Sequence, residues 1–403
     1  MGLHEVVRGG YLSEHFRGVG AKRLSAVEAL PNRSNQHELN GVQQLRRVFG
    51  ESRATFTASF IYLGENDETV FDSGFVTWYD AREDHPTRSE FRLYFPTTSV
   101  SEKAAEGDLA VCGLRPGGSV LVAIVQNGSS WEQQVRWLFG LHTDLGTTQA
   151  HTITGADDPR LDFAARQILQ GLGIEPEVAD NRYLEMLLQR FDGVFPKTAI
   201  FSAFARETLP DISALDDTDV ALVAWLEQEE MLFRTLERYL VAQRLDSGFE
   251  GVDDFIDYSL SVQNRRKTRA GHALEHHLSF IFNEFGIRHS RGAQTENKSK
   301  PDFVFPHIDN YHDPRFPVER LTVLAAKSTC KDRWRQALAE AVRVSNKHLV
   351  TLEPGISENQ TTEMIANQLQ LVVPASIHAT YSPHQREWLL DLRSFVDLVL
   401  ARQ

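Results

Sequence analysis

The hydrophobic pattern of this 403-residue chain changes its period near residue 160, and that change constrains the fold more than any other feature. Before it, apolar and polar residues alternate in stretches rich in Thr, Val and aromatics, which is typical of β-strands. Turn signals such as "GEND" and "RPGG" separate these stretches, which lie at 54–63, 69–79, 90–95 and 119–125. After residue 160, apolar residues recur at helical spacing. The sequence therefore predicts an N-terminal β-domain, a barrel or sandwich, followed by a different domain.

In the second part of the chain, strand-like and helical segments alternate, which predicts an α/β domain with a mixed sheet. The expected helices lie at 181–191, 219–245, 269–286 and 332–346, and Gly286 has the position of a C-cap. The expected strands lie at 300–306, 321–327, 347–352 and 369–374. Gly, Pro and charged residues in "GLGIEPEVADN" indicate an interdomain linker. We therefore expect domains at 1–174 and 183–403, joined by a linker at 175–182, with the second domain helical to about 260.

The net charge of −13 is distributed unevenly along the chain. Residues 151–260 carry 9 Lys and Arg against 22 Asp and Glu, whereas residues 261–350 carry 16 against 9. A basic block can steer a polyanion although the whole chain is acidic, and the acidic block is expected to face solvent or cover a basic surface. No apolar run approaches the roughly 20 residues of a membrane helix, and two cysteines suit a reducing compartment. The expectation is a cytoplasmic protein.

Two residues of the basic block, Asp302 and Lys327, indicate phosphodiester chemistry. Asp302 begins "DFVF" and Lys327 ends "LTVLAAK", so neighbouring strands could bring both side chains to one sheet edge. A carboxylate there can hold Mg²⁺, and a lysine can orient and help deprotonate an attacking water. The acid usually found two residues before such a lysine is missing, since that position is Ala325. Glu340 on the following helix and Glu275 on the preceding one are both candidates for the second carboxylate. The alternative is that they are solvated helix positions, and it applies more to Glu275 than to Glu340.

The triplet Lys331-Asp332-Arg333 follows the lysine strand. Lys and Arg can donate to guanine O6 and N7, and Asp can accept from the cytosine amine, so the triplet could read G·C pairs in a major groove. Taken alone, a solvated first helical turn with Asp332 near the positive end of the helix dipole explains the triplet as well. Its position beside Lys327 favours the reading function, because it would join recognition to cleavage.

At these residues the sequence resembles the EcoRII-like type II (type IIE) restriction endonucleases. Five segments carry the resemblance, in the family's order over about 110 residues: "RRKTRAGHALEHHL", "KPDFVFP", "YHDPRFPVE", "LAAKSTCKDRWRQALAEA" and "LVVP". The resemblance implies a Mg²⁺-dependent nuclease with a PD-(D/E)XK fold that cuts double-stranded DNA at short sites with CC and GG flanking a central base pair. It also implies a homodimer and a restriction-modification system with a cognate methyltransferase. Related enzymes flip the central pair, and the sequence does not place a pocket for flipped bases.

The resemblance implies a role for each candidate residue. Asp302 and Lys327 become the catalytic pair, with Asp302 and Glu340 as the metal ligands. Glu275 becomes a supporting or second-metal carboxylate and Tyr311 a supporting active-site residue. The base readers are then Lys331, Asp332 and Arg333.

The first domain is similar to the family's effector module, a B3-like pseudobarrel that binds a second copy of the site and controls cleavage. Two segments, "AKRLSA" and "TRSEFRL", would form its DNA-clasping arms. The residues implicated are Lys22, Arg23, Ser25, Arg88, Glu90 and Arg92. Pro86 and Phe91 stand where a member of the family has lysines, so effector affinity or sequence preference could differ.

Two other functions compete with the restriction enzyme. One is a structure-specific DNA repair nuclease of the same fold, which the position of the triplet opposes. The other is a DNA-binding regulator with an inactive nuclease domain, which the presence of Asp302, Lys327 and Glu340 opposes. A zinc site at His272 and His276 has helical spacing but lacks a third ligand.

Overall fold

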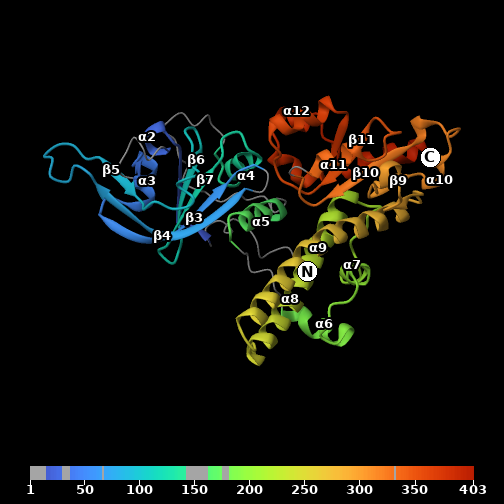
Figure 1. Ribbon diagram of the computed structural model, residues 1–403, viewed down its shortest axis with the longest axis horizontal. Helices are drawn as coiled ribbons and strands as arrows, with labels where there is room; N and C mark the ends of the chain where they lie inside the picture. The colour runs from blue at the N-terminus through green and yellow to red at the C-terminus, as the bar shows by residue number, and fades with distance from the viewer. Residues whose placement is uncertain (1–14, 30–36, 66–67, 142–161, 175–180, 331–332) are drawn as a thin grey trace. The chain divides into compact units, whose positions relative to one another are not determined.

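The computed structural model of this chain describes residues 15–29, 37–65, 68–141, 162–174, 181–330 and 333–403 (Figure 1). The chain folds into two compact units. The N-terminal unit comprises Met1–Ile174 and Pro354–Gln360, and the C-terminal unit comprises Glu175–Glu353 and Thr361–Gln403. Most of the expected linker, residues 175–180, lies outside the described residues.

A seven-stranded sheet forms the N-terminal unit, in the order β1-β6-β7-β3-β4-β5-β2. Its neighbouring strands are antiparallel except β3 and β7, which are parallel. The strands span Gly18–Arg23 (β1), Glu38–Asn40 (β2), Ala54–Leu63 (β3), Thr69–Asp80 (β4), Phe91–Tyr94 (β5), Leu109–Leu114 (β6) and Val120–Val125 (β7). The predicted β-domain is therefore present, and β3 and β4 form its long curved hairpin (Figure 1).

This sheet is covered on both faces, because successive residues of a strand point to opposite sides. Phe60 and Tyr62 of β3 lie in one core cluster, whereas Ile61 and Leu63 lie in the other. Helices α2 and α3 contribute to the first cluster, and α4 and α5 to the second. The helices span Ala26–Ala29 (α2), Gln43–Phe49 (α3), Ser130–Leu138 (α4) and Asp162–Gly171 (α5). Cys112 is buried in the first cluster.

Helices form the first part of the C-terminal unit, as their apolar spacing predicts. They span Asn181–Tyr183 (η3, a 3-10 turn), Leu184–Phe191 (α6), Thr198–Glu207 (α7), Thr218–Ser247 (α8) and Val252–Glu284 (α9). The long helices α8 and α9 form a hairpin (Figure 1). After α9, Gly286 has the left-handed φ of 67° and its N–H donates to the carbonyl of Asn283 at 2.9 Å, as its predicted C-cap role requires.

The acidic block is partly buried within these helices rather than only facing solvent. Glu229 of α8 and His277 of α9 are fully buried, with Nε2 of His277 3.0 Å from Oε2 of Glu229. Arg206 of α7 donates to Nδ1 of the same imidazole at 2.9 Å. Burial lowers the pKa of His277 against the opposing effect of Glu229, so the ring is neutral at pH 7. The counter-charge of Glu229 comes from a neighbouring helix, since Nη1 of Arg269 on α9 lies 3.8 Å from its Oε1.

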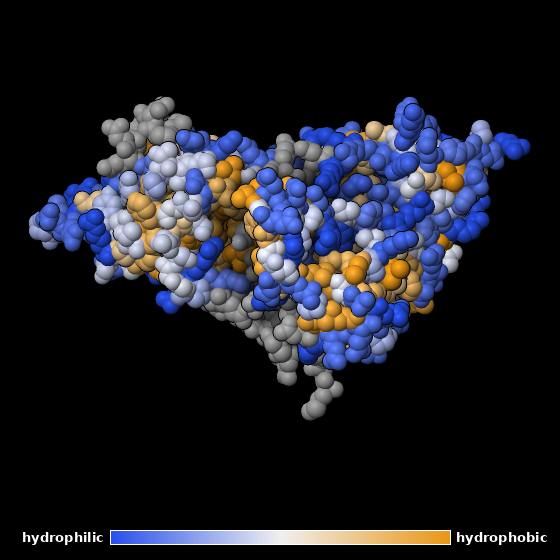
Figure 2. Space-filling model, turned by 60° about the horizontal axis from the view of Figure 1, so that its bottom comes forward, coloured by the Kyte–Doolittle hydropathy of each residue, from blue (hydrophilic) through white to orange (hydrophobic). Residues whose placement is uncertain are grey.

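The outer surface of the α8–α9 hairpin is mixed in character. Exposed apolar side chains near its turn are Leu245, Val252, Phe255, Ile256 and Leu260. Figure 2, which brings forward the side on which the hairpin projects, shows orange patches among mainly hydrophilic atoms. Over the described residues, no helix combines the length and the apolar composition that crossing a bilayer requires.

A five-stranded mixed sheet forms the second part of the C-terminal unit, in the order β12-β11-β10-β9-β8. The pairs among β10, β11 and β12 are parallel, and those among β8, β9 and β10 are antiparallel. The strands span Ser290–Arg291 (β8), Phe303–Phe305 (β9), Thr322–Lys327 (β10), Lys347–Thr351 (β11) and Leu369–Val372 (β12). The helices and 3-10 turns span Glu296–Lys298 (η4), Ile308–His312 (α10), Val318–Arg320 (η5), Trp334–Ala339 (α11), Glu358–Ala366 (α12), Ala375–Thr380 (η7), Pro383–Arg386 (α13) and Leu392–Arg402 (α14). The predicted mixed sheet is confirmed.

The helix expected at 332–346 is much shorter than predicted. Glu340 has extended angles (φ −85°, ψ 146°) and Ala341 has a left-handed φ of 50°, so α11 stops at Ala339. Ala341 and Val344 instead turn inward and pack with Tyr311 in a small core cluster. Burial of these apolar side chains outweighs the helical propensity of the segment.

Candidate active site

Asp302 and Lys327 meet at one edge of the C-terminal sheet. Asp302 directly precedes β9 and Lys327 ends β10, and these strands are antiparallel neighbours. Oδ2 of Asp302 accepts hydrogen bonds from Nζ of Lys327 at 2.9 Å and from the N–H of Ala326 at 2.7 Å. Ala325 is buried and offers only a methyl group, so a second acid has to come from another segment.

Glu340 supplies a second carboxylate near this pair. Burial raises the pKa of Glu340 to about 7, the charge of Lys327 opposes that shift, and the charge of Asp302 adds to it. Lys347 also opposes the shift. These effects reach Glu340 because the charged groups lie close to it. Its carboxylate accepts no hydrogen bond from the residues that the structure describes.

The donor set around Asp302 suits a magnesium ion. Mg²⁺ binds through one or two carboxylates and retains several waters. Both hydrogen bonds to Asp302 go to Oδ2, so Oδ1 has no partner among the described residues and is available as a ligand. A cation would also stabilise the ionised form of Glu340, which burial disfavours. In the described part of the chain, no three or more His, Cys, Asp or Glu residues form a metal cluster, so water and phosphate oxygens would complete the coordination.

Tyr311 lies behind Glu340 and not against the Asp302–Lys327 pair. The Tyr311 side chain is buried, its hydroxyl donates to Oε2 of Glu296 at 2.6 Å, and it accepts from the N–H of Arg343 at 3.2 Å. Burial and the hydrogen bond to Glu296 raise the pKa of Tyr311, so the hydroxyl remains protonated. The position of Tyr311 is therefore that of a support for the segment that carries Glu340.

Sequence reasoning missed two charged residues near the site, Glu296 and Lys347. Glu296 begins the 3-10 turn η4 in the polar stretch "TENK", where a carboxylate normally faces solvent. Lys347 begins the buried strand β11 and is only 8% exposed. A lysine at the start of an apolar strand is only a weak sequence signal of a buried functional residue. The sequence around Glu296 contained no such signal.

Glu275 of α9 lies in a separate ion pair. Its Oε2 accepts from Nε and Nη2 of Arg291 at 3.0 and 2.7 Å. Nη1 of the same arginine donates to Nδ1 of His276 at 2.7 Å. The Nε2 atom of His276 lies 3.2 Å from the hydroxyl oxygen of Thr198, so both ring nitrogens of the candidate zinc ligand His276 have hydrogen-bond partners. No contact with Asp302 or Lys327 links Glu275 directly to the pair.

Of the three expected base readers, only Arg333 can be placed, because Lys331 and Asp332 lie outside the described residues. Arg333 is exposed at the N-terminus of α11, and its N–H donates to the carbonyl of Cys330 at 2.9 Å. Cys330 is fully buried, and its N–H donates to the buried carboxylate of Glu353. Cys330 therefore anchors the chain before α11 in the core, and Arg333 lies at the surface.

In the N-terminal unit, the first expected arm is held by internal ion pairs. Lys22 is buried and pairs with the buried carboxylate of Glu28, whose Oε2 also accepts from the Ser25 hydroxyl at 2.8 Å. Burial acts to raise the pKa of Glu28, but the hydrogen bonds from Lys22 and from the backbone together lower that pKa by more than burial raises it. The carboxylate is therefore ionised. Lys22 is thus engaged inside the protein, whereas Ser25 is exposed and bonds to Glu28 from the surface.

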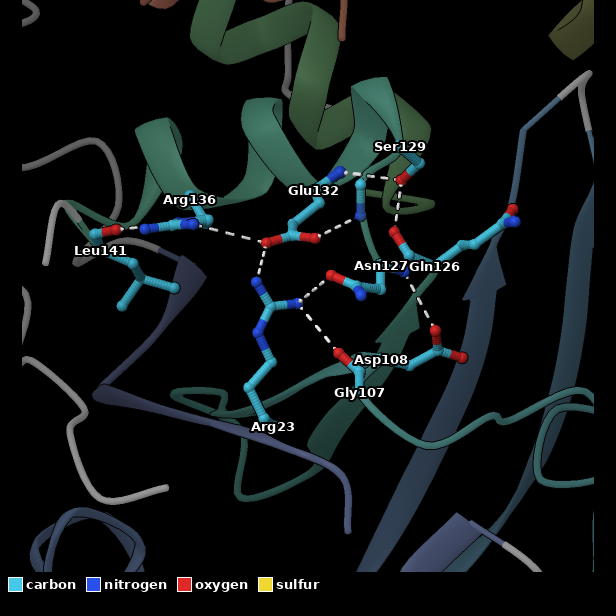
Figure 3. Close-up of polar contacts among 10 residues, drawn as sticks. Arg23, Gly107, Asp108, Gln126, Asn127, Ser129, Glu132, Arg136 and Leu141 are labelled. Atoms are coloured by element: carbon cyan, nitrogen blue, oxygen red, sulfur yellow. Dashed lines mark hydrogen bonds and ion pairs between the residues drawn. The ribbon is translucent and has the colours of Figure 1, made fainter. Parts of the chain in front are cut away.

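Arg23 lies at the centre of a polar cluster beside the start of α4 (Figure 3). Its guanidinium pairs with Glu132 and donates to the Gly107 carbonyl at 3.0 Å and to Oδ1 of Asn127 at 3.1 Å. Arg136 contacts the same carboxylate of Glu132 at 3.4 Å. Arg23 therefore ties β1 to the loop and helix that follow β7.

The second expected arm contains one uncommitted cation. Arg88 is exposed and forms no hydrogen bond or ion pair with any described residue. Glu90 instead accepts from Arg82 at 2.6 Å and from Arg92 at 2.7 Å. Arg92 also pairs with Glu38 at 2.6 Å. These carboxylates raise the pKa of the Arg92 guanidinium and compensate its charge.

Comparison with known proteins connects the site to one family. Residues 233–396 match the family model described as EcoRII C terminal. Over 233 residues the chain is 40% identical to the type II restriction enzyme EcoRII of Escherichia coli, and the alignment covers 58% of this chain and 57% of that enzyme. The chain thus matches little more than half the length of this curated relative.

Two solved structures are similar at lower levels. Metal-depleted Ecl18kI in complex with uncleaved, modified DNA has a TM-score of 0.44 and 17% identity, covering 55% of this chain and 83% of that chain. A complex of the restriction endonuclease PspGI with substrate DNA has a TM-score of 0.44 and 16% identity, covering 52% of this chain and 93% of that chain. Residues 233–396 of this chain are thus similar to the C-terminal region of the EcoRII family.

Proposed function

We propose that this protein is a site-specific type II restriction endonuclease that hydrolyses phosphodiester bonds of double-stranded DNA with Mg²⁺. The observation that carries the proposal is the contact of Lys327 with Asp302 at 2.9 Å, with the free carboxylate of Glu340 nearby. The match of residues 233–396 to the EcoRII C-terminal family model supports it. Mg²⁺, held by Asp302 and Glu340, would neutralise charge on the scissile phosphate.

The protein residues divide the remaining work. The N–H of Ala326 fixes the Asp302 carboxylate through Oδ2, so that Oδ1 keeps no partner among the described residues. The Lys327 amine lies beside that carboxylate, where it can orient a water for in-line attack and accept or release its proton. Glu275, held by Arg291, and Tyr311, held by Glu296, are assigned supporting roles.

Recognition is assigned to the start of α11 and to the N-terminal unit. Lys331, Asp332 and Arg333 would read G·C pairs in the CC and GG parts of a short site. A symmetric site is most simply read by a two-fold protein, so the enzyme is proposed to act as a homodimer. The N-terminal unit would bind a second copy of the site, with exposed Arg88 as its uncommitted cation.

Digestion of a sequenced plasmid with and without Mg²⁺, followed by mapping of the ends, tests this function. Discrete fragments with common end sequences support a restriction endonuclease. Cutting only at forks, flaps or single-stranded regions would instead support the repair nuclease. A gel shift without cleavage in Mg²⁺ would support the regulator with an inactive nuclease domain.

A further inference from the structure

The carboxylate of Glu340 has an unusual support for a proposed metal ligand. Asp302 is fixed by strand pairing, whereas Glu340 follows a helix of only six residues and precedes a left-handed alanine. The end of so short a helix is readily frayed, because its last carbonyls have no intrahelical partners. Positioning of Glu340 therefore requires contacts from other segments of the chain.

On the N-terminal side of Glu340, Lys347 provides such a contact. Its Nζ donates to the carbonyl of Leu338 at 3.0 Å, two residues before Glu340. Lys347 lies at the start of β11 and is 8% exposed, so its side chain is fixed by the sheet. A cation that binds a terminal carbonyl of a helix also stabilises the negative end of the helix dipole. The last turn of α11 is thereby held to β11.

On the C-terminal side, Glu296 provides the opposite contact. Its carboxylate accepts a hydrogen bond from the hydroxyl of Tyr311 at 2.6 Å. That hydroxyl accepts in turn from the N–H of Arg343 at 3.2 Å. Through Tyr311, Glu296 thus fixes the backbone amide of Arg343, three residues after Glu340.

The guanidinium of Arg343 completes this second attachment. It donates to the carbonyls of Tyr311 and of Asp313, the latter at 2.8 Å, and so holds the chain around α10 against the same segment. Residues from η4, α10 and β11 therefore converge on 338–343. These contacts involve backbone groups, so they fix the main chain and leave the Glu340 carboxylate unoccupied.

We propose that Glu296 and Lys347 are positioning residues that hold Glu340 from its two sides and so set the geometry of the metal site. Neither residue is a metal ligand or touches the reacting atoms. The proposal rests on the proposed function, since it concerns the acid of that same site. The Glu340 carboxylate lies beyond the end of α11 and not on β10, the strand of Lys327. The two positioning residues explain how it can nevertheless have a defined geometry.

The test compares Glu296→Ala and Lys347→Met with the native protein in three measurements. These are the Mg²⁺ concentration that half-saturates cleavage, calorimetric binding of Ca²⁺ to the protein–DNA complex, and DNA affinity in EDTA. Loss of a group that orients a metal ligand typically costs about 10- to 100-fold in metal affinity. We therefore expect a shift of about that size in both metal measurements, with DNA affinity in EDTA unchanged.

Conservative variants separate positioning from folding. Glu296→Gln keeps an acceptor for the hydroxyl of Tyr311, and Lys347→Arg keeps a donor for the carbonyl of Leu338, so both should restore most of the metal affinity. Glu319→Ala and Lys197→Met, at exposed positions, are the matched controls and should match the native protein. If one of the variants Glu296→Ala and Lys347→Met does not fold, its conservative counterpart and the other deletion variant are measured instead. A folded deletion variant whose metal affinity equals that of the native protein overturns the proposal.

Failure of this proposal is distinguishable from failure of the proposed function. A native protein that cuts DNA with Mg²⁺, together with folded Glu296→Ala and Lys347→Met variants of native metal dependence, would overturn the positioning role alone. A native protein that neither cuts DNA nor binds Ca²⁺ would overturn the enzyme itself.

Discussion

The Nζ atom of Lys327 lies 2.9 Å from Oδ2 of Asp302, although the two residues are 25 positions apart in the chain. Antiparallel pairing of β9 with β10, in which Phe303 faces Leu324, brings them together. Because Asp302 also accepts from the Ala326 backbone, the amine and carboxylate are oriented before any substrate arrives. The following predictions build on this arrangement and on the contacts around it.

Lys327→Ala should stop cleavage while leaving DNA binding intact. Removing a positioned proton-transfer group typically lowers a rate by roughly 10²- to 10⁴-fold. Single-turnover cleavage in Mg²⁺ measures the rate, and gel shift in Ca²⁺ measures binding. A variant that still cut DNA at the native rate would remove Lys327 from the mechanism.

Arg333→Ala should relax sequence discrimination at one base pair. A bidentate contact to guanine is worth about 1–3 kcal/mol of discrimination, so affinity for the native site should fall while affinity for unrelated DNA stays similar. Competition binding against single-base variants of the site measures this. Arg393→Ala, an exposed arginine on α14 paired with Asp397 at 3.1 Å, is the control. Uniform weakening across all sequences would make Arg333 a phosphate contact instead.

Lys22→Ala should destabilise the N-terminal unit more than it weakens DNA binding. Removing one partner of a buried ion pair leaves the Glu28 carboxylate unpaired, at a cost of roughly 3–5 kcal/mol in the free energy of unfolding. Urea denaturation measures this change. Arg88→Ala should show the opposite behaviour, with native stability and a slope of DNA binding against log salt that is smaller by about 1. Equal stability of Lys22→Ala and the native protein would contradict the buried pair.

The free energy of unfolding of the C-terminal unit should decrease as the pH is lowered, because of His348 on β11. Burial chiefly, with the charge of Arg402, lowers the pKa of His348 from 6.5 to about 4. Below pH 6.5 the unfolded chain binds a proton that the folded one excludes, so stability is lost as the pH falls from about 6.5 to about 4, by about 3 kcal/mol.

Urea unfolding at several pH values measures this dependence. His348→Phe should remove that part of the pH slope, because phenylalanine cannot be protonated and can fill the space beside Phe395. His384→Phe, at an exposed position on α13, is the matched control. An unchanged slope in His348→Phe would show that another group controls acid unfolding.

The sequence predicted the parts of the fold that depend on local periodicity. Alternation in β3 anticipated a strand with Phe60 and Ile61 on opposite faces, and helical spacing anticipated α8 and α9. The pairing of Asp302 with Lys327 was also predictable, because each residue stands at the end of a recognisable strand.

Features that depend on long-range contacts were not predictable in this way. The end of α11 before Glu340 is set by burial of Ala341, which helix propensity does not register. Glu296 is distinguished from a solvated glutamate by the hydrogen bond that the Tyr311 hydroxyl donates to it. The acidic block was expected to face solvent or to cover a basic surface, and neither expectation anticipated the fully buried contact of Glu229 with His277, 48 residues away.

The division of the candidate site among β9, β10 and the chain beyond α11 has a consequence for a cell that makes such a protein. A nuclease whose reacting groups came from one local segment could become active as soon as that segment emerged during translation. Here the groups converge only after strands distant in the chain have paired, so a nascent or unfolded copy carries no assembled centre. The chromosome of the producing cell would be exposed to the activity only once synthesis and folding of the C-terminal sheet are complete.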